Sequence, residues 1–292
     1  MKKMQYKLGI SMAASWAWGI SLGVSFSILQ EKGVIPFLLW GTFNIIALTV
    51  YGLFIRKYPK YLNLKNNQIV KMFMLIMQIW AIWINVKIMA MFVGDIPATI
   101  IAAVFFFLTY KYGFNFSLNS DQWQYLIMIV GLILVIVLGK HENNFVMGNN
   151  INWAIWGGIG LLTGPFIDSQ HFQRASKAKS IKPFIIASIA FGLYLTLVYL
   201  AAYFNNGIAA ILMALIVIAV STSTLDSCIA SLQYLTNNKL TIIISVLALI
   251  IWPIFKTRTA VEIWSIYGIG RIYIVIPLII LTVWRTKYGQ RH

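Results

Sequence analysis

Apolar residues form ten long runs along this chain, separated by short polar segments. The runs lie at about residues 8–29, 34–55, 70–93, 97–114, 122–139, 151–167, 184–204, 207–235, 239–255 and 261–284. Each approaches the roughly 17–25 residues that a helix needs to cross a bilayer. The pattern therefore predicts an all-α polytopic membrane protein with ten transmembrane helices.

The composition agrees with this prediction. The chain of 292 residues is 60% apolar and only 10% charged, and its mean hydropathy is +0.80. A water-soluble core does not need so much apolar surface. The longest segment between runs is about 56–69, so no soluble domain is predicted. The first run contains Trp16 and Trp18 and is longer than a usual signal-peptide core, which indicates a retained helix.

Basic residues are distributed unequally between the two sides of the predicted membrane. With the N-terminus inside, 17 of the 23 Lys and Arg residues fall inside, whereas Lys32, Lys140, Lys256 and Arg258 fall outside. This bias predicts a multi-pass protein of the cell (inner) membrane with both termini cytoplasmic. It also accounts for the net charge of +16 through contact with anionic lipid, without nucleic acid. No soluble protein partner is predicted.

The polar stretch Lys140–Asn150 divides the chain into two units of five helices, residues 1–142 and 143–292. Because five is odd, the second unit must insert upside down, as in inverted-repeat transporters, whose sites lie at discontinuous helices. Helix 1 is rich in small residues near Ala14–Gly19. Helix 6 contains Thr163–Pro165, and a proline removes a helical hydrogen bond. We therefore expect two inverted five-helix repeats with helices 1 and 6 broken.

The eighth run carries an unusual polar stretch, residues 219–231. At helical spacing Val220, Ser223, Thr224 and Ser227 share one face. Hydroxyl and carbonyl oxygens on one face suit a small hard cation such as sodium. The alternative is that the hydroxyls only tighten helix packing or bond to their own backbone. The same stretch contains Asp226, and a carboxylate at the centre of a membrane helix costs about 2.5–3.5 kcal/mol on insertion scales.

Enzyme chemistry finds no support in the sequence. The single Cys228 excludes an internal disulfide. The histidines His141, His171 and His292 fall in predicted loops or the tail, so zinc-site and catalytic-triad spacings are missing. Neither a phosphate-binding glycine loop nor a nucleophile elbow occurs. The chain is therefore predicted not to be an enzyme.

Two stretches carry a resemblance to a known family. Val220–Ser227 resembles the Ser-Thr-x-Asp-Ser signature in the eighth core helix of the sodium–solute symporters, which have the leucine-transporter-type fold. Pro165–Ser180 resembles the exit of that family's sixth helix, and the segment from Ala13 to Gly33, with Trp40, is more loosely similar to its helix 1–2 unit.

The resemblance implies a sodium site between helices 1 and 8. Its ligands would be backbone carbonyls and two hydroxyls, which fall on Ala14, Ala17, Val220, Ser223 and Thr224. It also implies a solute site beside the ion, where we expect the side chains of Trp16, Trp18, Gln78, Trp80 and Asp168.

The chain departs from the family in two respects. It has only the ten-helix core, and bulky Trp16 and Trp18 stand where small or polar groups often line the family's solute site, so no family substrate is carried over. Asp226 and Arg271 are further charges within the runs, with coupling or structural roles. Arg271 could pair with a carboxylate of the protein or with that of an anionic solute.

The sequence thus predicts a secondary transporter that carries a small organic solute together with sodium. Three alternatives stay open. One is a drug/metabolite-type ten-helix transporter without a sodium site. Another is a non-transporting sensor or assembly subunit built on a trimmed symporter core. The third is coupling to protons through Asp168 or Asp226.

Overall fold

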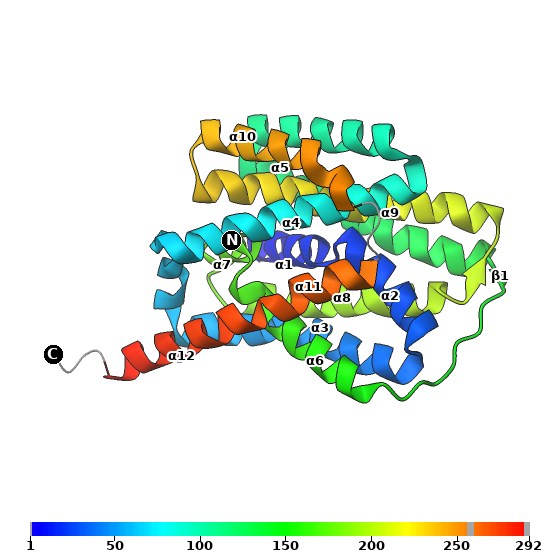
Figure 1. Ribbon diagram of the computed structural model, residues 1–292, viewed down its shortest axis with the longest axis horizontal. Coiled ribbons are helices and arrows are strands. Elements are labelled where there is room, and N and C mark those ends of the chain that lie inside the picture. Colours follow the sequence, from blue (N-terminus) through cyan, green and yellow to red (C-terminus); the bar gives the residue numbers. More distant parts are fainter. Residues whose placement is uncertain (1, 256–259, 289–292) are drawn as a thin grey trace.

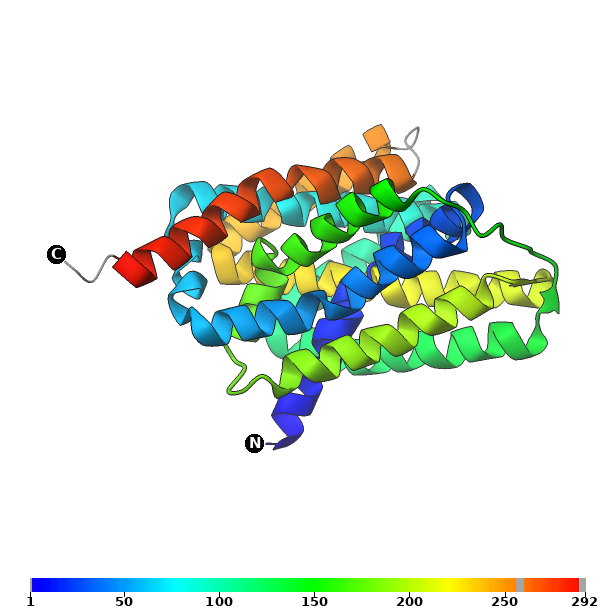
Figure 2. The ribbon, with the colours of Figure 1, turned by 90° about the horizontal axis from the view of Figure 1, so that it is seen from below.

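The protein is a bundle of long helices that lie side by side (Figures 1 and 2). The structure, a computed structural model, describes residues 2–255 and 260–288. Helices make up 87% of it. By length and apolar character five helices can cross a membrane singly, and a sixth span forms if one bent pair is counted as a unit. The five are α3 (Val34–Lys57), α4 (Gln68–Val93), α5 (Asp95–Leu138), α8 (Lys182–Ala201) and α9 (Gly207–Leu235).

The first and sixth apolar runs are each divided in two. α1 (Lys2–Trp16) and α2 (Gly19–Glu31) meet at a bend of 51°. α6 (Ile151–Thr163) leads through the 3-10 turn η2 (Gly164–Phe166) into α7 (Ser169–Ala175). The discontinuities predicted in these two runs are therefore present. The remaining elements are η1 (Pro59–Asn66), β1 (Lys140–His141), β2 (Phe204–Asn205), α10 (Asn238–Ile251), η3 (Trp252–Phe255), α11 (Ala260–Gly270) and α12 (Ile272–Tyr288).

Short polar side chains set where several helices begin. Asn67, Asn150, Asn206 and Asn237 each accept a hydrogen bond from a backbone N–H in the first turn of α4, α6, α9 and α10, respectively. Asp168 does the same for α7. Such caps satisfy N–H groups that have no partner within the helix, which matters most where no water is at hand.

α5 combines two of the predicted helices. It bends at Gly113, whose φ of 66° lies in the left-handed region that glycine adopts without steric cost. Beyond the bend the helix continues without interruption to Leu138. The apolar runs leave residues 115–121 in a segment between two predicted helices, but in the structure these residues are helical and Asp121 is fully buried.

Apolar side chains cover the outside of the bundle. Ile189 on α8, Phe107 on α5 and Ile250 on α10 are 68%, 63% and 67% exposed, respectively. A soluble protein rarely exposes apolar surface on this scale, whereas lipid tails favour it. The protein is therefore embedded in a membrane.

α9 occupies the centre of the bundle. All its residues from Ala219 to Leu232 are buried, and its largest contacts are with α5 and α4. Around this centre α1 packs along α8, and α3 packs along α6. The hydroxyl-rich part of α9 is thus enclosed on all sides, so its polar groups must find partners inside the protein.

Candidate functional site

The break after α6 follows from its sequence. Pro165 has no N–H, and the N–H of Gly164 bonds the carbonyl of Leu161 instead of the one a full α-helical turn would use. The carbonyl of Gly160 then accepts a hydrogen bond from Nε of Arg271, at 2.7 Å. The side chain of Arg271, which lies between α11 and α12, therefore replaces the lost backbone bond and is held at the break.

The breaks in the first and sixth runs touch each other. The ring of Trp16, the last residue of α1, lies edge-on to the ring of His171 in α7, with centroids 5.1 Å apart. A Cβ placed on Gly164 would lie 2.5 Å from Cη2 of Trp16. Two interrupted helices that are far apart in the sequence thus meet inside the bundle.

The first break also lies against α9 and α4. Trp18 joins α1 to α2 with a φ of 24°, which is unusual for a bulky residue. The N–H of Gly19 donates to Oδ1 of Asn85 on α4, at 2.8 Å. A side chain on Gly19 would overlap the hydroxyl of Ser221 on α9. The backbone at this break therefore approaches the hydroxyl-rich helix closely.

The residues that the resemblance assigns to sodium are all fully buried; they are Ala14, Ala17, Val220, Ser223 and Thr224. The Thr224 hydroxyl donates to the carbonyl of Val220, at 3.3 Å. The Ser223 hydroxyl donates to Oδ1 of Asp121 on α5, at 2.5 Å. The carboxylate beside Ser223 is therefore that of Asp121, not that of Asp226.

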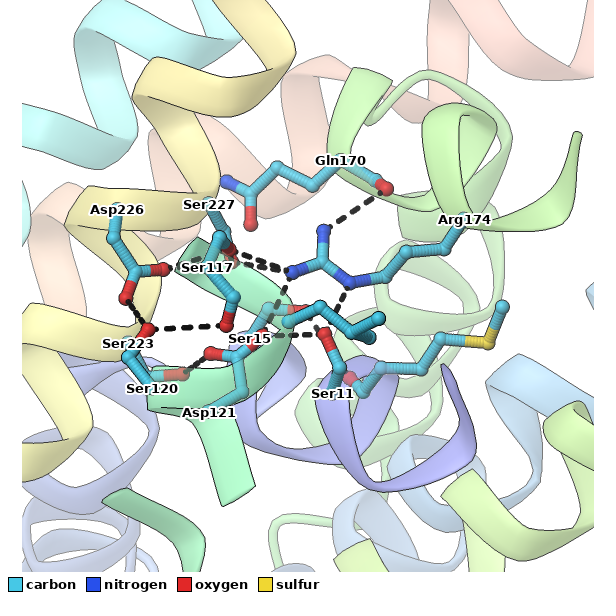
Figure 3. A network of polar contacts seen from close by, with 12 residues as sticks. Ser11, Ser15, Ser117, Ser120, Asp121, Gln170, Arg174, Ser223, Asp226 and Ser227 are labelled. Atoms are coloured by element: carbon cyan, nitrogen blue, oxygen red, sulfur yellow. Dashed lines mark hydrogen bonds and ion pairs between the residues drawn. The ribbon is translucent and has the colours of Figure 1, made fainter. Parts of the chain in front are cut away.

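A buried ion pair lies at the centre of this region (Figure 3). Nη2 of Arg174 is 2.9 Å from Oδ2 of Asp121, and both side chains have no exposed surface. Ser11 on α1 bridges the pair, since its hydroxyl donates to Asp121 and accepts from Nε of Arg174. Nη2 also donates to the hydroxyls of Ser117 and Ser227. The pair therefore joins α1, α5, α7 and α9.

Asp226 belongs to the same network and faces α5. Its carboxylate accepts hydrogen bonds from Ser117 at 2.9 Å, from Ser120 at 2.6 Å and from Gln124 at 3.4 Å. These contacts fix Asp226 against α5. The Asp226 carboxylate is therefore bonded by two hydroxyl groups and one amide group of α5.

Sequence reasoning missed the members of this network outside α9. The charge pattern counts Arg174 among the 17 basic residues predicted inside, and His171 is predicted in a loop, yet both are fully buried because α7 turns back against α9. Asp121 was not singled out at all. A hydropathy pattern places isolated charges in loops by default, and only the pairing of an Arg and an Asp 53 residues apart could have indicated otherwise.

Asp168 forms a second buried cluster at the helix-6 break. Its Oδ1 accepts from the N–H of Gln170 at 3.0 Å and from Nε2 of Gln78 at 3.1 Å. Its Oδ2 has no hydrogen-bond partner among the described residues and lies 3.8 Å from Nε2 of His171. Gln170 in turn donates to Gln78 and to Cys228. This carboxylate is buried, so it is not a surface charge beyond a kink.

The predicted solute residues separate into three places. Trp16 and Trp18 meet Arg271 at a small cavity, with Ser21, Asn44, Leu161 and Trp264. Gln78 and Asp168 bond each other but do not line that cavity. Trp80 is half-buried and packs against Trp83 elsewhere on α4, with ring centroids 6.1 Å apart.

No family model matches the chain, and neither does any curated protein. The functional argument therefore rests on the geometry of the two breaks, the buried network and the cavity.

Proposed function

We propose that this protein is a secondary active transporter that carries a small organic solute together with sodium by alternating access. The contact between the two helix breaks carries the proposal. Discontinuous helices that meet in a membrane bundle are the usual place for solute and ion sites, because their free backbone groups can bind a ligand. The resemblance of Val220–Ser227 to the sodium–solute symporters supports the same assignment.

The proposed architecture has ten spans in two inverted repeats, residues 1–142 and 143–292. The helix contacts support it: the first run packs on the seventh as α1 on α8, and the second packs on the sixth as α3 on α6. A pseudo-two-fold axis that exchanges the repeats would turn each of these contacts into the other. We further propose that the protein lies in the cell membrane with both termini in the cytoplasm.

The proposed ion site lies between the α1 break and α9. Its support is the close approach of Gly19 to Ser221, together with the buried oxygens of Val220, Ser223 and Thr224. Sodium is here cargo that must leave again. Neutral oxygens with the Asp121–Arg174 pair nearby suit reversible binding, because that pair carries no net charge.

A thermal-stability measurement tests the ion site. In sodium chloride the purified protein should be more stable than in potassium chloride at equal ionic strength. Binding that is specific to the folded state contributes about 2.7 kcal/mol at one hundred times the Kd. The double variant Ser223→Ala with Thr224→Val should lose this difference, since two ligands are removed.

Thr222→Val is the matched control. It removes a hydroxyl from the same helix, on the face that accepts a hydrogen bond from Gln124. It should keep the sodium response. A double variant that responds to sodium as the wild type does would show that the site is wrong.

Proton coupling is the second candidate. It is favoured by the Oδ2 atom of Asp168, which has no hydrogen-bond partner among the described residues and lies 3.8 Å from Nε2 of His171. Stabilisation by acid, with no difference between sodium and potassium, would favour this version.

A further inference from the structure

A polar pocket opens at the end of the bundle where η1, the start of α4 and the end of α9 meet. Its volume is about 210 Å³, several times the roughly 30 Å³ that one water molecule takes in the liquid, so a group the size of a phosphate fits. None of the described residues in its wall is acidic. The lining residues are Lys65, Asn66, Gln68, Lys71, Tyr234 and Leu235.

Two lysines give this pocket its charge. Nζ of Lys65 lies 3.8 Å from the centroid of the Tyr234 ring, so the tyrosine on α9 holds this ammonium group in the wall. Lys71 stands close to the start of α4 and is half-buried, as Lys65 is. The N-terminal end of this helix of 26 residues adds a partial positive charge. The pocket therefore has a positive potential that favours an anion.

The acidic residues of the chain do not offset this charge. Three of the seven are fully buried inside the bundle. The other four are exposed and adjoin the opposite ends of the helices that meet at the pocket, since they precede α3, follow α4, lie beside β1 or follow α10. These four are Glu31, Asp95, Glu142 and Glu262. The surface around the pocket is therefore basic.

Exposed apolar side chains adjoin the pocket on α4. Ile69 and Met72, which are neighbours in sequence of the lining residues Gln68 and Lys71, are 65% and 52% exposed, respectively. A free anion gains nothing from such side chains, whereas the acyl chains of a phospholipid can pack on them while its phosphate enters the pocket. The combination of a basic pocket and adjoining apolar surface therefore favours a lipid over a soluble anion.

η1 connects this pocket to the helix-6 break. Tyr61 lies on η1, four residues before Lys65, and is fully buried. Its hydroxyl donates to the backbone carbonyl of Phe166 at 2.9 Å, and its ring centroid lies 5.6 Å from that of Phe172 on α7. A group that binds Lys65 therefore holds the same short segment that bonds the break.

We propose that this pocket binds the phosphate of an anionic phospholipid, such as phosphatidylglycerol, from the adjoining membrane leaflet. Lys65 and Lys71 are the counter-charges, and the side chains of Asn66 and Gln68 carry amide groups that can donate to phosphate oxygens. The bound lipid holds η1 in place and so stabilises the break. This inference does not depend on which solute or ion the protein carries.

Native mass spectrometry of the purified protein in detergent, with added dioleoyl phosphatidylglycerol, tests the proposal. One lipid should bind more tightly than any further ones, and dioleoyl phosphatidylcholine, whose headgroup has no net charge, should not replace it. Lys65→Gln together with Lys71→Gln should weaken this first binding step at least about tenfold, because both counter-charges of the phosphate are lost. Bound phosphatidylglycerol should also slow amide hydrogen exchange in residues 58–67 of the wild type.

Lys57→Gln together with Lys60→Gln is the matched control. It removes two exposed lysines of the same connection, and Lys57 also lies over a tyrosine ring, 5.6 Å from the centroid of Tyr58. The control should bind the lipid as the wild type does. Equal melting temperatures of the two double variants in lipid-free detergent exclude unfolding as the cause of a difference.

Three results would overturn the proposal. An equal loss in the control would show that the lipid is attracted only by the general surface charge. Equal binding of phosphatidylcholine would show that the phosphatidylglycerol charge is not recognised. Displacement of the lipid by an about hundredfold excess of inorganic phosphate would make the pocket a site for the free anion. Unchanged hydrogen exchange in residues 58–67 on lipid binding would refute the stabilisation of the break.

Discussion

The Arg174–Asp121 pair shows how single residues keep charge inside this bundle. Each buried charge is costly to insert, but here the two lie 2.9 Å apart and serine hydroxyls occupy their remaining bonding positions. Such a pair adds little net stability, yet removing one partner leaves the other uncompensated. Removing either residue alone is therefore expected to cost more stability than replacing both together.

Arg174→Met should lower the free energy of unfolding by about 3–5 kcal/mol, because Asp121 is left buried without its counter-charge. Adding Asp121→Asn to that variant should recover much of the loss. Denaturant unfolding in detergent micelles measures both, with exposed Arg56→Met as the control. If the two single losses simply add in the double variant, the pair is not coupled.

Among the elements, the short helix α7 is the least expected from sequence and the most consequential. Pro165 and the small residues of helix 1 could indicate the breaks, because their effect on the backbone is local. The path of the chain after the break could not be read in this way. Arg174 and His171 become buried only because α7 folds back onto α9, and a hydropathy pattern carries no information on that contact.

Asp168 caps α7, which allows its charge to be separated from its structural role. Asn is as good an N-cap as Asp, so Asp168→Asn should keep wild-type stability, whereas Asp168→Ala should lose about 1 kcal/mol. If the charge takes part in coupling, Asp168→Asn should also impair sodium-driven solute uptake into proteoliposomes or shift its pH dependence. Melting temperatures and uptake rates measure the two effects. Wild-type uptake at every pH would limit Asp168 to capping.

At the scale of the whole molecule, the connections fall into two groups. η1, the α9–α10 connection and the end of α12 lie at the left end of the bundle, and β1 with the segment after it lies at the right end (Figure 1). The membrane class and the alternation of the runs could be predicted from the sequence, because both follow from length and hydropathy. The packing order of the helices around α9 could not, since nearly every run is apolar enough to face lipid or protein.

A reporter fused after the last residue should be cytoplasmic. The basic connections Arg56–Lys71 and Lys177–Lys182 have the same predicted side as both termini. Green fluorescent protein there should fluoresce, and alkaline phosphatase should be inactive. Phosphatase joined after Asn149, in the polar stretch between the repeats, is the control and should be active. The opposite pattern would invert the proposed orientation.

The backbone at Trp18 gives the α1–α2 joint a mechanical property. This is the only non-glycine among the described residues with a positive φ, and such a conformation costs on the order of 1–3 kcal/mol. The packing of the surrounding helices holds the joint in this strained conformation. A movement that lets Trp18 adopt an ordinary conformation recovers this energy, which lowers the cost of changing the angle between α1 and α2.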